Sequence, residues 1–459
     1  MLPRGAVDIG GPVHLYLDGS GSMRGFVTVR GESPYLEALR FLPQSLARSA
    51  IGMQVFRFAT GIEPRPHSGK LEAEILSDGF YRTQAGGSNT QVSAGATHLH
   101  EVLRRAASES DTTSVIVSDL FLSAAEVHGG DSGPLRKTLA DILHKDLTVA
   151  IIGVQAPFNG RVFDLATTPS GVQLTNGFRP FYVLLVGPDA RVRSMYDTLR
   201  SEVLEGMPAG SHHLAVYSRR PLPKRGWVQR IDLRDGAATA SLLSKDVPHT
   251  AVEQIAIGRR AGGAEVTLEQ EDTKTGWDAA QAAVPDITQA SAKSTLHFFG
   301  DGRHGCENGW VEDDDHPGLL RLTQGKTDRL SFDVFPQPAA TYGLRPKVPY
   351  TLDAAVMIPA LQPAPPVRHW IQEWGYDASQ EKALLDRLAQ REKKLTTRLP
   401  AKGSKAAPEP EKVEAAESAD RFLFPTLNLL SLNDLMVRII RDNYSAERIH
   451  AFRIAFKLD

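Results

Sequence analysis

Three oxygen-bearing side chains stand at alternate positions near the start of the chain: Asp18, Ser20 and Ser22, in the stretch VHLYLDGSGSMRGF. A carboxylate and two hydroxyls suit a hard divalent cation such as Mg2+ better than zinc or copper. On a turn that leaves a strand, alternate residues can point toward one centre, and Gly19 and Gly21 relax the backbone there. The pattern therefore indicates a candidate metal site.

Two more oxygen-bearing candidates follow, each at the boundary of an expected helix or strand. Thr97 stands in GATHLHEVL, at the start of an expected helix, and Asp119 follows the apolar run SVIVS. Thr90, in GGSNT, is the alternative to Thr97. Because ligands bind at the carboxyl ends of strands in open α/β sheets, we expect Asp18, Asp119 and one of these threonines to meet at that edge.

Other interpretations of the same residues stay open. An Asp/Ser turn can satisfy loop amides without any ligand. A phosphotransferase with Asp18 as nucleophile needs a second acid two residues later as general acid and base, and the hydroxyl of Ser20 stands there instead. The alternatives are therefore a turn, a site that has lost its ion, and a metal-dependent phosphotransferase or phosphatase that uses Asp18, with Asp119 as a second ligand.

The first half of the chain alternates expected strands with expected helices, which predicts a mostly parallel sheet covered by helices on both faces. Apolar runs rich in β-branched and aromatic residues indicate strands; they cover residues 13–17, 53–58, 114–118, 147–154 and 181–187. Apolar residues at helical spacing indicate helices between several of them; these cover residues 33–50, 97–107, 135–144 and 190–204.

The second half has a different texture. Strand-like runs with polar interruptions, separated by glycine, proline and acidic turns, indicate a β-rich domain of the sandwich kind. A charged helical segment follows, and then a stretch rich in Ala, Pro, Glu and Lys that has little to bury and indicates a flexible linker. Near the end of the chain an apolar helical face precedes an alternating strand; the face consists of Leu432, Leu435, Met436, Ile439 and Ile440.

These patterns predict an α/β domain, a β-rich domain, and a C-terminal helix and strand that dock on the β-rich domain. The expected boundaries are 1–210 for the α/β domain, 211–365 for the β-rich domain, 366–399 for the charged helical segment, 400–420 for the linker and 421–459 for the C-terminal helix and strand.

Composition narrows the class of protein. Of 459 residues, 41% are hydrophobic and 23% are charged, and the formal net charge of −2 gives no electrostatic indication of a nucleic acid or an anionic membrane as partner. The single cysteine, Cys306, can form neither an internal disulfide nor a cysteine-based zinc site, which suits a reducing compartment. With no signal-like segment and no run of about 18 apolar residues, we expect a cytoplasmic protein without a membrane segment.

Over roughly its first 190 residues the chain resembles the von Willebrand factor A (vWA) domain family. Asp18, Ser20 and Ser22 match the Asp-x-Ser-x-Ser element of that family's metal-ion-dependent adhesion site (MIDAS), Thr97 matches its threonine, and Asp119 matches the aspartate of its third element. The third element usually reads Thr-Asp-Gly and reads Ser-Asp-Leu here, so the carboxylate is kept and the glycine is lost. The resemblance implies a Rossmann-like fold and a Mg2+ ion, or else Mn2+ or Ca2+, held by these five side chains.

The resemblance also implies a protein-interaction module and not an enzyme. In the family, the ion keeps one position for an Asp or Glu of a partner protein, so that the cation bridges two acidic groups that otherwise repel. Similar intracellular proteins often work beside AAA+ ATPases, kinases, phosphatases or proteases, some of them in stress or defence responses. A structural subunit, whose metal site locks one interface of an assembly, is a further alternative.

Overall fold

The computed structural model describes residues 11–458, apart from a set of internal stretches. Those stretches are 30, 32, 50, 60, 67–69, 82–97, 121–132, 169, 220–224, 236, 240–252, 259, 261–262, 273–276, 279–280, 283, 286, 302–307, 314–317, 327–328, 363, 399–421 and 445. The chain divides into two compact units. Unit 1 consists of Met1–Leu222, Trp277–Ala283 and Pro363–Asn443, and unit 2 consists of Pro223–Gly276, Val284–Gln362 and Tyr444–Asp459.

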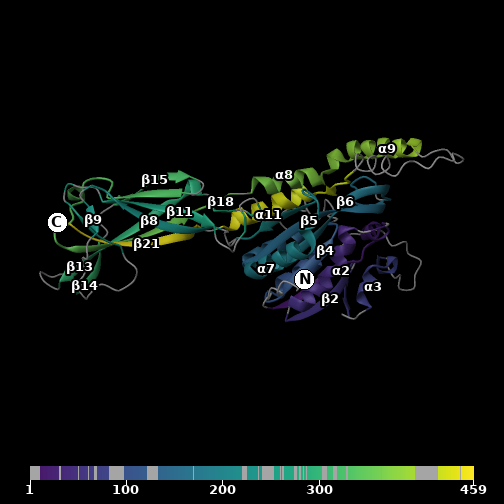
Figure 1. Cartoon of the computed structure of the whole chain (residues 1–459), viewed down its shortest axis with the longest axis horizontal. Helices are drawn as coiled ribbons and strands as arrows, with labels where there is room; N and C mark the ends of the chain where they lie inside the picture. The colour runs from purple at the N-terminus through teal and green to yellow at the C-terminus, as the bar shows by residue number, and fades with distance from the viewer. Residues whose placement is uncertain are drawn as a thin grey trace. The chain divides into compact units, whose positions relative to one another are not determined.

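A seven-stranded sheet with the order β3-β2-β1-β4-β6-β5-β7 forms the centre of unit 1 (Figure 1). Its strands are β1 (Pro12–Asp18), β2 (Gly52–Phe58), β3 (Ile62–Arg65), β4 (Thr113–Ser118), β5 (Leu147–Val162), β6 (Val172–Pro188) and β7 (His212–Tyr217). β2, β1 and β4 run parallel to one another, and the remaining neighbours pair antiparallel. The sheet is mixed, so the expectation of a mostly parallel sheet is corrected to a partly parallel one.

A long hairpin accounts for much of the antiparallel part. β5 and β6 follow one another directly and pair from Leu147 opposite Pro188 to Val162 opposite Val172. Consecutive strands whose connection turns straight back, here residues 163–171, pair antiparallel, whereas a parallel pair needs a crossover connection. The apolar runs at 147–154 and 181–187 form only the inner parts of these strands. The outer parts, residues 155–162 and 172–180 next to the connection, also contain polar residues and therefore form no apolar run.

Helices cover both faces of the sheet because its central strands are apolar on both sides. On β1, Val13, Leu15 and Leu17 belong to a buried cluster that also contains residues of α2 (Pro34–Ser49), whereas the alternate residue Tyr16 stacks on Phe56 with ring centroids 4.9 Å apart. Arg105 of α4 (Leu99–Ser108) lies over the ring of Phe56. The alternation of the pleat thus sends successive side chains into different layers.

The helices of this α/β part are α1 (Arg24–Val27), α2 (Pro34–Ser49), α3 (Leu71–Ile75), α4 (Leu99–Ser108), α6 (Pro134–His144) and α7 (Asp189–Leu199), with the 3-10 turns η1 (Gly21–Met23) and η2 (Asp78–Tyr81) and the π-helical turn η3 (Arg200–Leu204). α2, α4, α6, and α7 with η3 lie close to their expected positions, whereas the short helices α1 and α3 were not predicted. Ser33 caps α2 by accepting a hydrogen bond from Leu36 N at 3.2 Å. Ser-Pro and Gly-Pro pairs stand at the starts of α2 and α6, where the fixed φ of proline suits the first turn of a helix.

The segment Pro363–Asn443, called the C-terminal segment below, also belongs to unit 1. Its elements are α8 (Pro365–Trp374), β19 (Gly375–Tyr376), η6 (Ala378–Gln380), α9 (Glu381–Arg398), β20 (Thr426–Leu427) and α11 (Leu429–Asn443). Before β20 the chain runs beside the hairpin, where Phe178 N donates to Phe422 O at 2.9 Å and Phe424 N donates to Phe178 O at 2.8 Å. This segment therefore reaches the outer part of β6.

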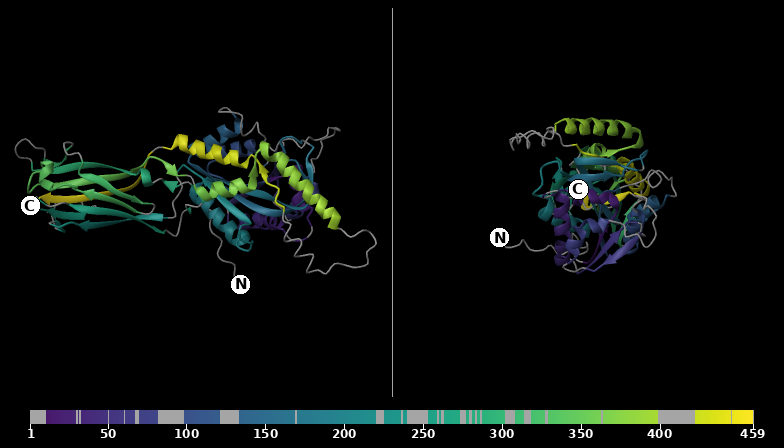
Figure 2. Two further views of the ribbon diagram at one scale, coloured as in Figure 1. Left: turned by 90° about the horizontal axis from the view of Figure 1, so that it is seen from above. Right: turned by 90° about the vertical axis from the view of Figure 1, so that its right-hand side faces the viewer.

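Unit 2 contains a six-stranded and a four-stranded sheet that share one apolar core, which confirms a β-rich unit (Figure 2). The sheet orders are β14-β13-β17-β21-β10-β9 and β15-β16-β11-β8. The elements are β8 (Arg225–Leu233), β9 (Ala237–Thr239), β10 (Glu253–Ile257), β11 (Ala264–Asp272), β12 (Val284–Pro285), η4 (Ile287–Gln289), β13 (Ser291–Asp301), β14 (Asn308–Asp313), β15 (Leu320–Lys326), β16 (Arg329–Val334), η5 (Ala339–Tyr342), β17 (Pro349–Ile358), β18 (Leu361–Gln362) and β21 (Glu447–Leu458).

The structure corrects the expected docking of the C-terminal elements. β21 pairs with β17 and β10 and belongs to the β-rich unit as predicted, but α11 belongs to unit 1, where it contacts α6 and α8. Unit 1 also keeps β7 and takes in Trp277–Ala283, so the expected boundaries at 210 and 365 do not separate the units. The expected linker, 400–420, lies outside the described residues.

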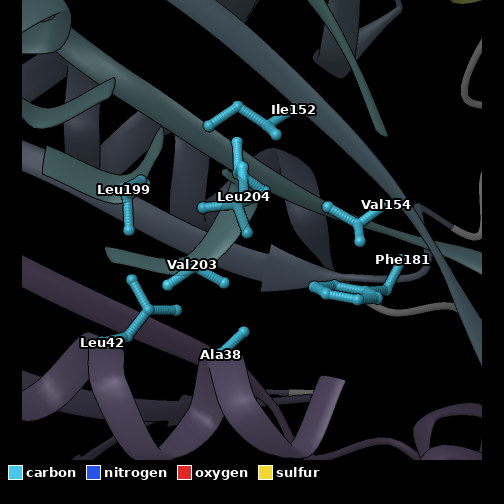
Figure 3. A pocket seen from close by; sticks show the side chains of 9 residues that line it. Ala38, Leu42, Ile152, Val154, Phe181, Leu199, Val203 and Leu204 are labelled. Carbon is cyan, nitrogen blue, oxygen red and sulfur yellow. The ribbon is translucent and has the colours of Figure 1, made fainter. Parts of the chain in front are cut away.

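A small cavity in the core of unit 1 is lined only by apolar side chains from α2, β5, β6, α7 and η3 (Figure 3). It has room for about one water molecule, and an apolar space of this size offers a water no hydrogen-bond partner. Within the described ranges, no helix combines the length and apolar character that crossing a bilayer requires.

Candidate metal site

Asp18 and Asp119 come together because their strands are parallel neighbours. Asp18 ends β1, Asp119 directly follows β4, and the strands pair in register up to Leu17 opposite Val117. From β1 the chain continues to β2 on one side, whereas β4 lies on the other side. In open α/β sheets, ligands bind at such a reversal of strand order, outside the carboxyl ends of the strands.

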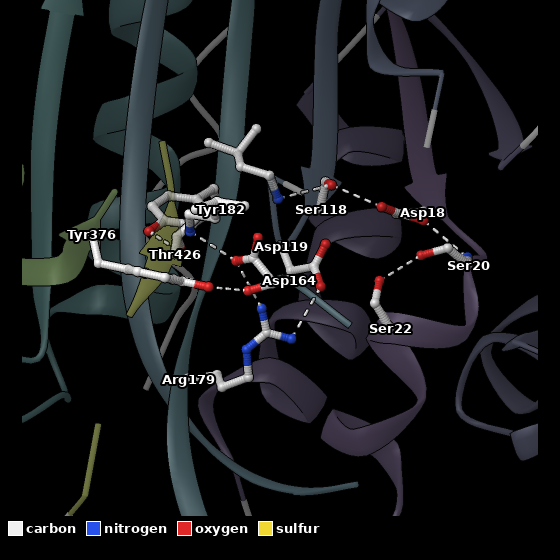
Figure 4. Close-up of polar contacts among 12 residues, drawn as sticks. Asp18, Ser20, Ser22, Ser118, Asp119, Asp164, Arg179, Tyr182, Tyr376 and Thr426 are labelled. Carbon is white, nitrogen blue, oxygen red and sulfur yellow. Dashed lines mark hydrogen bonds and ion pairs between the residues drawn. The ribbon is translucent and has the colours of Figure 1, made fainter. Parts of the chain in front are cut away.

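The loop after β1 is shaped by hydrogen bonds among the predicted residues (Figure 4). Ser20 N donates to Asp18 Oδ1 at 2.9 Å, and the hydroxyls of Ser20 and Ser22 lie 2.8 Å apart. Gly19 is required by close packing, because a Cβ there would lie 2.3 Å from Nε of the buried Arg57. Arg57 in turn donates to Gly19 O at 3.1 Å and fixes the start of the loop.

The loop after β4 is held by Ser118 and Leu120. Ser118 Oγ donates to Asp18 Oδ2 at 2.7 Å and accepts from Leu120 N at 3.1 Å, so one hydroxyl ties the two loops together. Leu120 has φ 54°, the left-handed region that costs a non-glycine residue about 1 kcal/mol. A glycine would adopt that conformation freely, whereas the side chain of Leu120 is fully buried and anchors the loop by packing.

A buried arginine and a third aspartate complete the site. Arg179, on the outer part of β6, places Nη1 3.2 Å from Asp119 Oδ2 and Nη2 3.4 Å from Asp164 Oδ2. The side chains of all three residues are fully buried. Arg179 also lies over the ring of Phe158, 5.2 Å from its centroid.

Burial dominates the electrostatics of these carboxyls. The pKa of Asp18 is raised to about 7: burial is the largest cause, the nearby Asp119 adds to the shift, and hydrogen bonds from Ser20 and Ser118 oppose it. Burial also raises the pKa of Asp164 to about 7, against the lowering effect of Arg179. When all three aspartates are ionised, one guanidinium leaves two negative charges uncompensated, which is the charge that one divalent cation neutralises.

The side chains present fit a hard cation. Asp119 Oδ1 is buried and has no hydrogen-bond partner among the described residues, although a buried oxygen normally has one. It can serve as a ligand beside Asp18 and the hydroxyls of Ser20 and Ser22. Within the part of the chain that the structure describes, no group of three or more His, Cys, Asp or Glu is arranged to hold a metal, so an ion here depends on neutral hydroxyl oxygens. Such a donor set suits Mg2+ or Mn2+ and not zinc.

The structure thus brings together Asp18, Ser20, Ser22 and Asp119. Thr97 and its alternative, Thr90, lie outside the described residues. Asp18 and Asp119 are buried, and the loop reaches solvent through the partly exposed Ser20 and the exposed Gly21.

Sequence reasoning missed three residues of the site: Ser118, Asp164 and Arg179. Ser118 directly precedes a predicted ligand, and its hydroxyl at the end of a strand was the available signal. Asp164 and Arg179 gave none, because arginine and aspartate are mostly exposed and only the tertiary fold reveals a buried pair.

Comparison with known proteins adds no relative: no protein-family model, curated protein or solved structure matches this chain.

Proposed function

We propose that unit 1 is a vWA-type domain whose MIDAS-like site binds a divalent cation and, through it, an Asp or Glu of a partner protein. The observation that carries the proposal is the meeting of Asp18 and Asp119 at the switch in strand order, with Asp119 Oδ1 lacking a hydrogen-bond partner among the described residues. The vWA resemblance of the sequence supports the finer assignment.

The proposed ion is Mg2+, with Mn2+ or Ca2+ able to use the same oxygens. Asp18, Ser20, Ser22 and Asp119 would hold it, with Thr97 as the fifth proposed ligand. When bound, the ion supplies positive charge at a buried acidic site and so makes contact with a second acid attractive. In this proposal the protein's residues orient and neutralise one another, and the domain is an interaction module of an intracellular multi-protein system.

The first test is metal-dependent partner capture from extracts of the native cell with the full-length protein. Wild-type protein should retain one or more partners in Mg2+ and release them when a chelator is added. Asp18→Asn removes a ligand charge with little change in shape and should reduce Mg2+-dependent capture at least tenfold. Undiminished capture by a folded Asp18→Asn protein contradicts the proposal.

A matched control is Asp189→Asn, also in unit 1. Asp189 accepts hydrogen bonds from Thr148 Oγ1 at 2.7 Å and Trp277 Nε1 at 2.9 Å, away from the proposed ligands. This variant should capture partners like the wild type. Two other outcomes would favour the alternatives: turnover of a phosphomonoester that Asp18→Asn removes indicates a phosphatase, and an oligomer whose size follows the metal concentration indicates a structural subunit.

A further inference from the structure

Arg179 is an unusual residue for the interior of a sheet. Its guanidinium is fully buried, and removing a guanidinium from water carries a large cost that only well-placed charged partners offset. Asp119 and Asp164 are those partners, and each gives its Oδ2 atom to one arm of the fork. The pairing is two-pronged: the rigid guanidinium gives a separate nitrogen to each carboxylate, whereas a lysine has one nitrogen that would have to serve both.

The position of Arg179 decides which oxygen of Asp119 is left. Nη1 takes Oδ2, so Oδ1 is the carboxylate oxygen without a hydrogen bond among the described residues. Figure 4 shows Arg179 on the side of Asp119 that faces away from Asp18 and Ser22. Outer-shell partners of this kind fix the direction of a ligating carboxylate.

The C-terminal segment fixes Arg179 indirectly, through contacts with Asp164. Asp164 Oδ2, which pairs with Nη2, also accepts a hydrogen bond from Leu427 N at 2.9 Å. The hydroxyl of Tyr376 donates to the main-chain oxygen of Asp164. A line of polar contacts therefore runs from β19 and β20 through Asp164 and Arg179 to Asp119.

We infer that Arg179 is a positioning residue for the metal centre, which fixes Asp119 so that Oδ1 faces the cation, and that Asp164 ties this arrangement to the C-terminal segment. The inference rests on the proposed function, because it concerns the affinity of the same site. It assigns to Tyr376 and Leu427 a role in metal binding although neither is a proposed ligand.

A different role for Arg179 predicts the opposite result. If its charge only stood in for a metal, neutral Arg179→Gln would leave a more negative site and bind the cation more tightly, and Arg179→Lys would bind like the wild type. A positioning role predicts weaker binding in both variants, by about tenfold or more, because each loses the two-pronged contact.

The experiment is calorimetric titration of chelator-treated, full-length protein with Mn2+, supported by the rise in unfolding temperature that Mn2+ produces. Weaker binding in both arginine variants supports the positioning role. Unchanged affinity in Arg179→Lys, or unchanged or tighter binding in Arg179→Gln, overturns it.

Arg391→Gln is the matched control for the loss of a buried arginine. Arg391 is 7% exposed, lies on α9, and donates to Thr175 O at 2.9 Å and Asn176 O at 2.7 Å. Its removal should lower stability and leave Mn2+ affinity unchanged. A tenfold loss of affinity in this control would show that general destabilisation, and not positioning, lowers the affinity.

Circular dichroism of each variant shows whether it is folded. If neither Arg179 variant folds, Asp164→Asn replaces them, since it keeps the shape of the partner and removes the negative charge that pairs with one arm of the guanidinium. It should bind Mn2+ about threefold to tenfold more weakly, and unchanged affinity overturns the inference. Failure of the wild type to bind Mn2+ contradicts the proposed function itself, whereas wild-type binding with unchanged variants contradicts only the role of Arg179.

Discussion

Asp164 makes the stability of the protein depend on pH in a defined direction. Its pKa is raised to about 7 in the folded protein, mainly by burial; among the charged groups that bear on it, Arg179 opposes the shift, and Asp119 and Glu381 add to it. An aspartate in an unfolded chain has a pKa of about 3.9. Between these values the folded state holds a proton that the unfolded state has released, so the free energy of unfolding falls as the pH rises from about 4 to about 7.

Asp164→Asn should therefore flatten this dependence by up to about 1 kcal/mol per pH unit within that window. The measurement is urea unfolding of chelator-treated protein at several pH values between about 4 and about 8. Asp18 contributes a slope of the same sign, which the substitution leaves in place. A slope equal to that of the wild type would contradict the prediction.

Asp377→Asn serves as the control, because Asp377 shifts in the other direction. A hydrogen bond from Ser379 lowers its pKa, so the stability it adds is present above about pH 4 and is lost only as the pH falls further. The variant should lose the same stability throughout the window from about pH 4 to about pH 7 and keep the wild-type slope.

The ligand candidates could be predicted because their signal is local. An acid and two hydroxyls at alternate positions after an apolar run are visible in VHLYLDGSGS, and Asp119 follows a second apolar run. Arg179 could not be predicted, since its burial depends on Asp119 and Asp164, which are 60 and 15 residues away. Leu120 shows the same limit, because its positive φ is fixed by the loop and by burial, not by a residue type that favours it.

Helix α11 is the element whose place in the fold differs most from expectation. Its apolar face is evident in the sequence, and Leu432, Met436 and Ile439 are all buried. The apolar face shows that the helix packs against another part of the protein, but it does not identify that part. Polar contacts make the difference: Tyr217 OH donates to Asn433 Oδ1 at 2.9 Å, which attaches α11 to β7 of unit 1.

Ile439→Ala tests this assignment. Ile439 is 1% exposed, so the substitution should lower the free energy of unfolding by about 2–4 kcal/mol. Hydrogen exchange should speed up in β7 and α6, the neighbours of α11 in unit 1, and not in the strands of unit 2. Exposed Arg438 on the same helix supplies the control, and Arg438→Ala should stay within about 0.5 kcal/mol of wild type. Faster exchange confined to β17 and β21 would return α11 to the β-rich unit.

Element types were more predictable than element ends. The apolar stretches over 33–50 and 135–144 became α2 and α6 nearly as expected. The charged stretch at 366–399 became two helices, because Gly375 and Tyr376 pair as a short strand with Thr426 and Leu427. Such pairing with a distant segment leaves no periodicity in the sequence.

Each unit is built from several separate segments of the chain. The chain passes from one unit to the other after residues 222, 276, 283, 362 and 443. The sequence shows the change from α/β to β-rich patterns near residue 211. It does not show that later segments return to unit 1, because a pattern predicts the type of an element and not the surface on which it packs. Unit 1 accordingly includes the segments 277–283 and 363–443, which lie far along the chain from its first segment, 1–222.

A fragment that ends at residue 222 should therefore fail to form a stable monomer. It retains the sheet and lacks α8 and α11, whose buried faces include Trp370, Trp374 and Ile440. We expect aggregation or strong binding of a hydrophobic dye, and recovery of soluble protein when residues 363–443 are produced alongside as a second chain. A monomeric, cooperatively unfolding fragment would show that the later segments are dispensable.

The division of unit 1 into distant segments has a consequence for biosynthesis. A ribosome that adds roughly 5–20 residues per second needs on the order of 10 s to pass from residue 222 to residue 363, and during that interval the nascent α/β sheet lacks two of its helices. The emerging polypeptide therefore exposes apolar surface for seconds before residues 363–443 are synthesised, and chaperones can bind during that interval.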